Sequence, residues 1–105
     1  MLYQQGDVLL KKVYGQINLN DSERETLKDK RWVIAEGEHT GHAHAIAESE
    51  AIVYHKDGKR YVLTEKGFTI THEEHGSVTV EPGIYEVGIV QEYDHFTEEA
   101  KNVQD

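Results

Sequence analysis

Histidines gather in two short segments of this 105-residue chain, and their spacing suits metal ligands. The stretches GEHTGHAHAIAE and THEEH contain five of the seven histidines: His39, His42, His44, His72 and His75. Imidazole nitrogens, with carboxylates beside them, bind Zn, Fe, Mn or Ni. We therefore expect one divalent metal ion, of one of these elements, held jointly by the two segments.

The HAHAIAE stretch predicts which side chains share a face. If residues 42–48 form a strand, His42, His44 and Glu48 point to one side, because successive side chains alternate. A metal site needs further ligands, and we expect His72 or His75 to supply them from another strand. The expected metal ligands are therefore His42, His44, Glu48, His72 and His75.

The acidic residues between His72 and His75 are the candidates for catalysis. Glu73 or Glu74 could act as a general base, or could accept the second N–H of a ligating imidazole. With an open coordination position, the metal would polarise a small-molecule substrate or activate water, as in a hydrolase, lyase or oxygenase. The alternative is a non-catalytic protein, with either a closed structural metal site or an acidic surface that serves assembly, for instance in a phage particle.

The remaining histidines carry weaker expectations. His55 lies beside an Asp57-Gly58 turn and is expected to be an ordinary surface or turn residue that binds no metal. His39 has the wrong strand parity for joining His42 unless a turn intervenes, and His95 follows the last expected strand; either contribution stays open. HEEH does not predict a metalloprotease, because that motif needs histidines four residues apart on a helix.

The elements that must position these side chains are predicted to be strands. β-forming runs occupy residues 7–14, 31–36, 42–48, 51–64, 68–72, 77–81 and 84–93. Asp57-Gly58 divides the fourth run as a type I′ hairpin turn. Residues 20–30 could form a short helix, because Ser22 and Glu25 have capping-box spacing, or a solvated loop. Residues 96–103 predict a short C-terminal helical turn. The sequence thus predicts one all-β domain, residues 1–105, folded as a small barrel or sandwich.

Composition excludes several classes of function. The chain has 20 acidic and 11 basic residues, a formal net charge of −9, which disfavours nucleic acids and anionic membranes. It has no cysteine, so thiolate ligands and disulfides are excluded. The N-terminal stretch lacks a basic region and a long apolar run, and no segment reaches the length of a membrane span. We expect a cytosolic protein, bacterial or in a phage-infected host, with homo-oligomerisation left open.

The first histidine cluster resembles the first motif of the cupins, which is a glycine, His-x-His, three residues, glutamate and a later glycine. The matching residues are Gly37, His42, His44, Glu48 and Gly58, with the first gap one residue short. The resemblance implies a jelly-roll barrel that holds a metal through His42, His44 and Glu48. The second cupin motif is not matched, because Pro82 and Gly83 are adjacent and no histidine follows at the expected distance.

The whole chain also resembles a group of short bacterial and phage proteins to which no activity is assigned. The stretches that carry this resemblance are QGDVLL, GEHTGHAH, THEEHG, PGIYEV and QEYDHF. It implies that the two histidine segments and the EYD stretch belong together, and it implies no chemistry.

Overall fold

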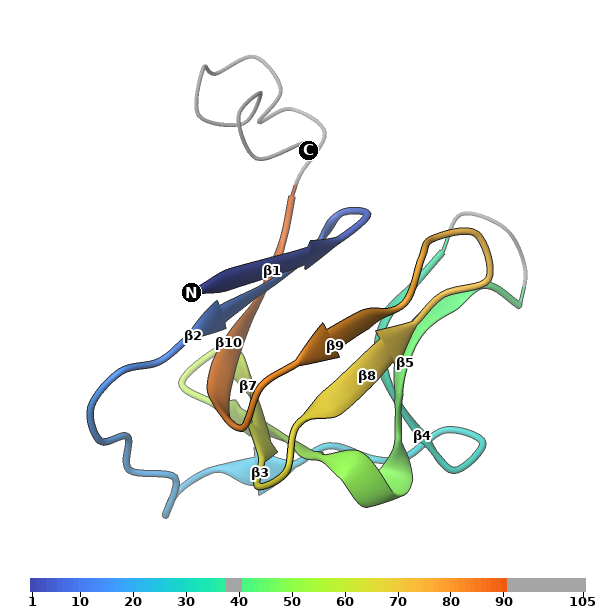
Figure 1. Ribbon diagram of the computed structural model, residues 1–105. Coiled ribbons are helices and arrows are strands. Elements are labelled where there is room, and N and C mark those ends of the chain that lie inside the picture. Colours follow the sequence, from blue (N-terminus) through green and yellow to red (C-terminus); the bar gives the residue numbers. More distant parts are fainter. Residues whose placement is uncertain (38–40, 91–105) are drawn as a thin grey trace.

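The computed structural model describes residues 1–37 and 41–90, which form two antiparallel β-sheets around a shared core (Figure 1). The larger sheet has the strand order β1-β2-β10-β7-β6-β3, and the smaller has the order β4-β5-β8-β9. The elements are β1 (Leu2–Gln5), β2 (Val8–Lys12), β3 (Glu23–Arg24), β4 (Arg31–Glu36), β5 (Ala43–Ala47), the 3₁₀ turn η1 (Glu48–Glu50), β6 (Ile52–Lys56), β7 (Lys59–Thr64), β8 (Phe68–Thr71), β9 (Val78–Val80) and β10 (Gly83–Ile89).

The predicted all-β class is confirmed, and the closed barrel is not what forms. Within the described residues, the larger sheet ends at β1 and β3 and the smaller sheet ends at β4 and β9. The sheets approach each other where β1 lies against β9 (Figure 1). The chain therefore forms two open sheets. No helix in the described part of the chain is both long and apolar enough to cross a membrane.

The core lies between the sheets because apolar residues alternate along the strands. In β4, Trp32 and Ile34 are buried while Val33 and Ala35 are partly exposed, the two-residue period of a sheet with one covered face. Each large apolar side chain removed from water stabilises the fold by roughly 1.5–3 kcal/mol. Both sheets contribute to the core: Val8, Leu10, Trp32, Ile34, Ile46, Ala51, Val53, Val62, Phe68, Ile70, Val80 and Tyr85.

Two tight hairpins follow from local turn chemistry. Asp57 and Gly58 join β6 to β7 with positive φ angles of 51° and 77°, as a type I′ turn requires. Gly6 and Asp7 join β1 to β2, with Gln5 opposite Val8. Gly6 has a φ of 57°, and a glycine at the first central position is typical of a type II′ hairpin. The Asp57-Gly58 turn was predicted from the sequence, whereas strand β1 was not.

Two other predictions differ from the structure or lie outside it. Of the two alternatives for residues 20–30, the helix is wrong and the segment is mostly exposed loop: Ser22 Oγ donates to Leu19 O, and Glu25 N donates across to Val53 O beside β3. Pairing with β6 therefore wins over capping-box propensity in this segment. The predicted helical turn at 96–103, and the end of the predicted strand beyond residue 90, lie outside the described residues.

A partly buried ion pair ties the larger sheet to β4. Arg60 on β7 binds both carboxylate oxygens of Glu25, at 2.6 and 2.9 Å, and donates to the carbonyls of Val33 and Ile34. The β4–β5 register shifts between Val33 and Ala35, so these carbonyls lie at a β-bulge. The guanidinium group of Arg60 carries several N–H donors in one plane, so it can bond to the Glu25 carboxylate and to these two carbonyls at the same time. His55 Nε2 also lies 2.7 Å from Glu25, so His55 belongs to this structural network.

Candidate metal site

His44 lies at the centre of the histidine cluster and is buried by its position on β5. Its side chain is on the face of β5 that also carries the core residue Ile46, while Ala43 and Ala45 point the other way. His44 is only 2% exposed. A polar ring so deeply placed requires hydrogen-bond partners on both nitrogens.

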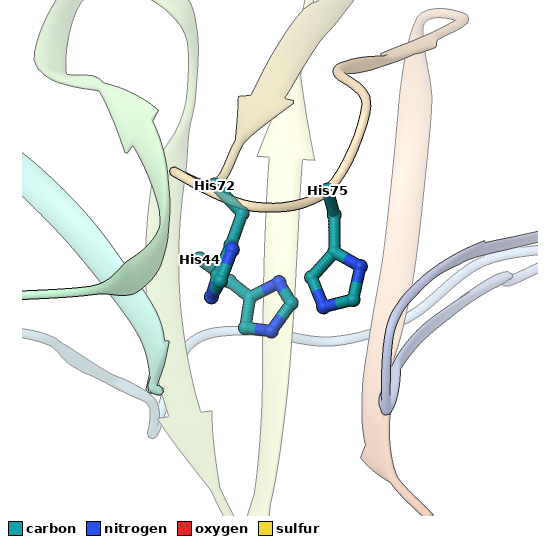
Figure 2. A group of neighbouring side chains, drawn as sticks. All are labelled: His44, His72 and His75. Carbon is teal, nitrogen blue, oxygen red and sulfur yellow. The ribbon is translucent and has the colours of Figure 1, made fainter. Parts of the chain in front are cut away.

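His72 and His75 reach His44 from the loop between β8 and β9. The ring centroid of His44 lies 4.4 Å from that of His72 and 5.7 Å from that of His75, and the latter two are 4.6 Å apart. Figure 2 shows the three rings converging, one from β5 and two from the loop. His72 is half-buried and His75 is exposed, so the cluster runs from the core to the surface.

The three imidazoles are spaced closely enough to share one cation. One nitrogen from each of His44, His72 and His75 can be chosen so that all three lie within 4.8 Å of one another. Nitrogens bound to one tetrahedral zinc ion at about 2.0–2.1 Å would lie roughly 3.3 Å apart. The nitrogens would therefore have to move closer together by up to about 1.5 Å to bind one ion. His72 Nδ1 accepts a hydrogen bond from the Glu74 N–H at 3.0 Å, so a metal ion would bind this nitrogen only in place of that backbone bond.

Gln5 at the end of β1 determines the tautomer of His44. Its Nε2 donates to the carbonyls of Ile70, at 3.0 Å, and Gly76, at 2.9 Å. Because both carbonyls only accept, the Gln5 amide nitrogen must face them, and Oε1 must face His44 Nδ1 at 2.8 Å. Nδ1 therefore carries a hydrogen. In the neutral ring, Nε2 is left with its lone pair, the arrangement of a metal-ligating histidine.

The charge state of His44 follows from its surroundings. Burial is the main cause that lowers its pKa, the neighbouring His72 lowers it further, and Asp7 opposes the shift. His44 is therefore neutral at neutral pH. Its Nε2 nevertheless lies 3.4 Å from Oδ1 of Asp7, a side chain that is 59% exposed. The Nε2 lone pair of His44 and the carboxylate of Asp7, which are both hydrogen-bond acceptors, thus face each other.

Glu73 holds the β8–β9 loop against β5. Its Oε1 accepts the backbone N–H of Ala43 at 2.8 Å. This bond, followed by one from its own backbone N–H, lowers the pKa of Glu73. A carboxylate made less basic and already bonded is a poor general base, so Glu73 is placed as a positioning residue. Glu74, the other predicted base, has Oε1 3.7 Å from Nδ1 of His42.

Two glycines allow the backbone to approach the histidines. A Cβ on Gly6 would lie 2.8 Å from Nε2 of His75 and 3.2 Å from Cε1 of His44. A Cβ on Gly37 would lie 2.9 Å from Cβ of His42 and 3.1 Å from Nε2 of His72. Gly37 also donates its N–H to His42 O at 2.7 Å. Both glycines therefore occupy positions where any side chain would press on the cluster.

Of the five predicted ligands, the structure brings three together. His42 precedes β5, and its ring centroid lies 5.9 Å from that of His72, at the margin of the group. Glu48 is exposed at the start of η1 and lines a different part of the surface. The cause is local: β5 ends at Ala47, so the alternation that was expected to align Glu48 with His44 stops before Glu48. His39 and His95 lie outside the described residues.

Sequence reasoning missed Gln5, Gly6 and Asp7. The signal was present, because Gly-Asp between LYQQ and VLLKK is a two-residue hairpin pattern. The pattern does not indicate that this hairpin lies over the clustered histidines, because they are at least 37 residues further along the chain.

Comparison with known proteins identifies a family and no activity. A family model described as a domain of unknown function, DUF8820, matches residues 4–90. This range includes Gln5, Asp7 and all three clustered histidines. The chain matches no curated protein and no solved structure. The cupin resemblance finds no support among these comparisons.

Proposed function

This chain belongs to the DUF8820 family, and from the geometry of its histidine cluster we propose that it binds one divalent transition-metal ion through His44, His72 and His75. Three imidazoles suit zinc, and also Fe, Mn, Co or Ni. The metal would join β5 to the β8–β9 loop.

The observation that carries this proposal is the fixed lone pair of His44. A buried histidine usually satisfies both nitrogens with protein donors or acceptors. Here Gln5 fixes the hydrogen on Nδ1, and Nε2 is directed toward a carboxylate, with two more imidazoles adjacent. A metal ion satisfies all of these acceptors at once. An ordinary core histidine would not need a second and a third imidazole beside it.

Catalysis receives less support than binding. Two surface pockets in the described part of the chain, of about 440 and 550 Å³, are lined by residues other than the clustered histidines. Glu73, a predicted general base, is bonded to the β5 backbone. We therefore propose a metal-binding protein and leave an enzymatic reaction out of the proposal.

The test is metal binding by three single variants. Untagged protein would be titrated calorimetrically with Zn²⁺, Co²⁺, Ni²⁺ and Mn²⁺, and its metal content measured after purification. His72→Ala and His75→Ala each remove a ligand near the surface. His55→Ala is the matched control, since His55 is 54% exposed and pairs with Glu25 elsewhere.

We expect one equivalent of metal in the parent protein and in His55→Ala. In the two cluster variants, affinity should fall by roughly tenfold or more, the scale on which even supporting residues around a metal matter. If the parent protein binds none of these ions, or if His55→Ala weakens binding as much as His72→Ala, the proposal is wrong.

A further inference from the structure

We infer that Asp7 is the fourth ligand of this metal, so that the ion is closed off by four protein side chains and connects the two sheets. The inference rests on the proposed function. Asp7 belongs to the β1–β2 hairpin of the larger sheet, whereas His44, His72 and His75 belong to the smaller sheet and its β8–β9 loop. Its carboxylate approaches His44 from the opposite sheet.

The distance between Asp7 and His44 is that of two ligands on one ion. Two atoms bound tetrahedrally to zinc at about 2.0–2.1 Å lie roughly 3.3 Å apart. Oδ1 of Asp7 and Nε2 of His44 are 3.4 Å apart. Because Gln5 holds the hydrogen of His44 on Nδ1, a cation between the facing Nε2 lone pair and the Asp7 carboxylate would satisfy both groups.

The backbone holds Asp7 at this position. Its carbonyl accepts the N–H of Val90 at 2.9 Å, at the end of β10. On the other side, Gln5 pairs with Val8 and its side chain reaches across to Ile70 and Gly76. Gly6 fits against the rings of His75 and His44, where a larger residue would collide. The hairpin is therefore fixed over the cluster before any metal arrives.

Three histidines and one carboxylate would together fill the four positions of a tetrahedral ion, which would close the site. Catalytic zinc sites keep one position for water or substrate, whereas structural sites fill all four. With Asp7 bound, the ion would clamp the tip of the β1–β2 hairpin to the β8–β9 loop. In this arrangement the metal ion would stabilise the junction between the two sheets.

The test compares Asp7→Asn and Asp7→Ala with Asp21→Asn, an exposed acidic residue in another turn. Each full-length variant would be titrated with Co²⁺, whose visible spectrum reports coordination number. Azide, a small anion that occupies open positions on cobalt, would then be added. Hydrogen exchange of the β1–β2 hairpin would be measured with and without Zn²⁺.

For the parent protein and Asp21→Asn we expect a four-coordinate cobalt spectrum that azide leaves unchanged, and slower exchange in the hairpin when Zn²⁺ is bound. For Asp7→Ala we expect a spectrum that responds to azide, loss of the hairpin protection, and affinity weaker by roughly tenfold to a hundredfold. Asp7→Asn should weaken affinity in the same direction, because an amide oxygen is a neutral and poorer ligand.

Two failures are distinguishable. Suppose that the parent protein binds metal and that His72→Ala binds it more weakly. If both Asp7 variants then have the same affinity and the same azide response as the parent, this inference is wrong while the proposed function stands. If the parent binds no metal at all, the proposed function is wrong, and the inference falls with it.

Discussion

Nδ1 of His44 lies 2.8 Å from Oε1 of Gln5, so the most buried histidine of the cluster is oriented by a residue of the opposite sheet. The same amide donates to carbonyls at Ile70 and Gly76, on both sides of the segment that carries His72 and His75. One buried side chain thus connects β1, β5 and the β8–β9 loop.

Replacing Gln5 should therefore affect both stability and metal binding. In Gln5→Ala two carbonyls and one imidazole N–H lose their partner, and buried unsatisfied groups cost about 1–3 kcal/mol each. We expect a fall of about 2–4 kcal/mol in the free energy of unfolding, measured by urea denaturation, and metal affinity weaker by roughly tenfold. Gln4→Ala is the control, since Gln4 bonds Gly6 O and not His44. Equal effects of the two substitutions would contradict the orienting role of Gln5.

Gly6→Ala should weaken metal binding by displacing His75. The new Cβ would lie 2.8 Å from Nε2 of His75, in a backbone with φ of 57°. Gly58→Ala introduces a similar backbone penalty, of about 1 kcal/mol, at φ of 77° with open space around the Cβ. Both variants should lose comparable thermal stability, and only Gly6→Ala should lose metal affinity in calorimetric titration. Undiminished affinity in Gly6→Ala would show that His75 is not held by this contact.

Glu73 and Glu74 should differ in their effects although they are adjacent. Glu73→Gln weakens the bond to the Ala43 N–H, so the loop that carries His72 and His75 should exchange amide hydrogens faster and bind metal more weakly. Glu74→Gln leaves that bond intact. Because the pKa of Glu73 is lowered in the folded state, its contribution to stability is present above pH about 4.5 and is lost as the pH falls below it. The acid limb of a pH–stability curve should thus flatten in Glu73→Gln and not in Glu74→Gln.

The metal-free protein should lose stability as the pH drops below about 6.5. Burial and the neighbouring His72 lower the pKa of His44 in the folded protein. In this pH range His44 therefore binds a proton in the unfolded chain and stays unprotonated in the folded one. By linkage, the free energy of unfolding then decreases as the pH falls, and it is fully restored above the unfolded pKa. Urea midpoints between pH 5 and 7.5, a window of about the ordinary histidine range, would be compared for the parent, His44→Gln and His55→Gln. A slope unchanged in His44→Gln would show that another group causes it.

Tyr85 should determine part of the alkaline limit. Burial, with Tyr3 nearby, raises its pKa to about 12 from an ordinary value of 10.0, and its hydroxyl donates to Glu81 O at 2.7 Å. Between these values the unfolded chain loses a proton that the folded chain keeps, so stability falls as the pH rises above about 10. Tyr85→Phe should lower stability at neutral pH by about 1 kcal/mol and flatten the alkaline fall. Tyr14→Phe, at an exposed tyrosine, should leave that fall intact.

Local patterns were sufficient for much of the secondary structure. The strand over residues 31–36 and the Asp57-Gly58 hairpin were predicted and are present. These features depend on side-chain alternation and turn conformation, which neighbouring residues decide. The 20–30 helix failed because its backbone groups found partners on β6, a choice that no local signal contains. The barrel failed for a similar reason, since sheet closure depends on which edges meet.

The sequence by itself determined that this chain is all-β, strongly acidic, free of cysteine, and equipped with two histidine segments of metal-ligand composition. Only the tertiary structure decided which side chains lie together. It brought His44, His72 and His75 close to one another, placed Glu48 elsewhere because β5 ends at Ala47, and brought Gln5 and Asp7 to His44 from the opposite sheet. The physical reason is that ligand geometry is set by the packing of two sheets, and residue spacing along one strand carries no information about the residues that another sheet brings across the core.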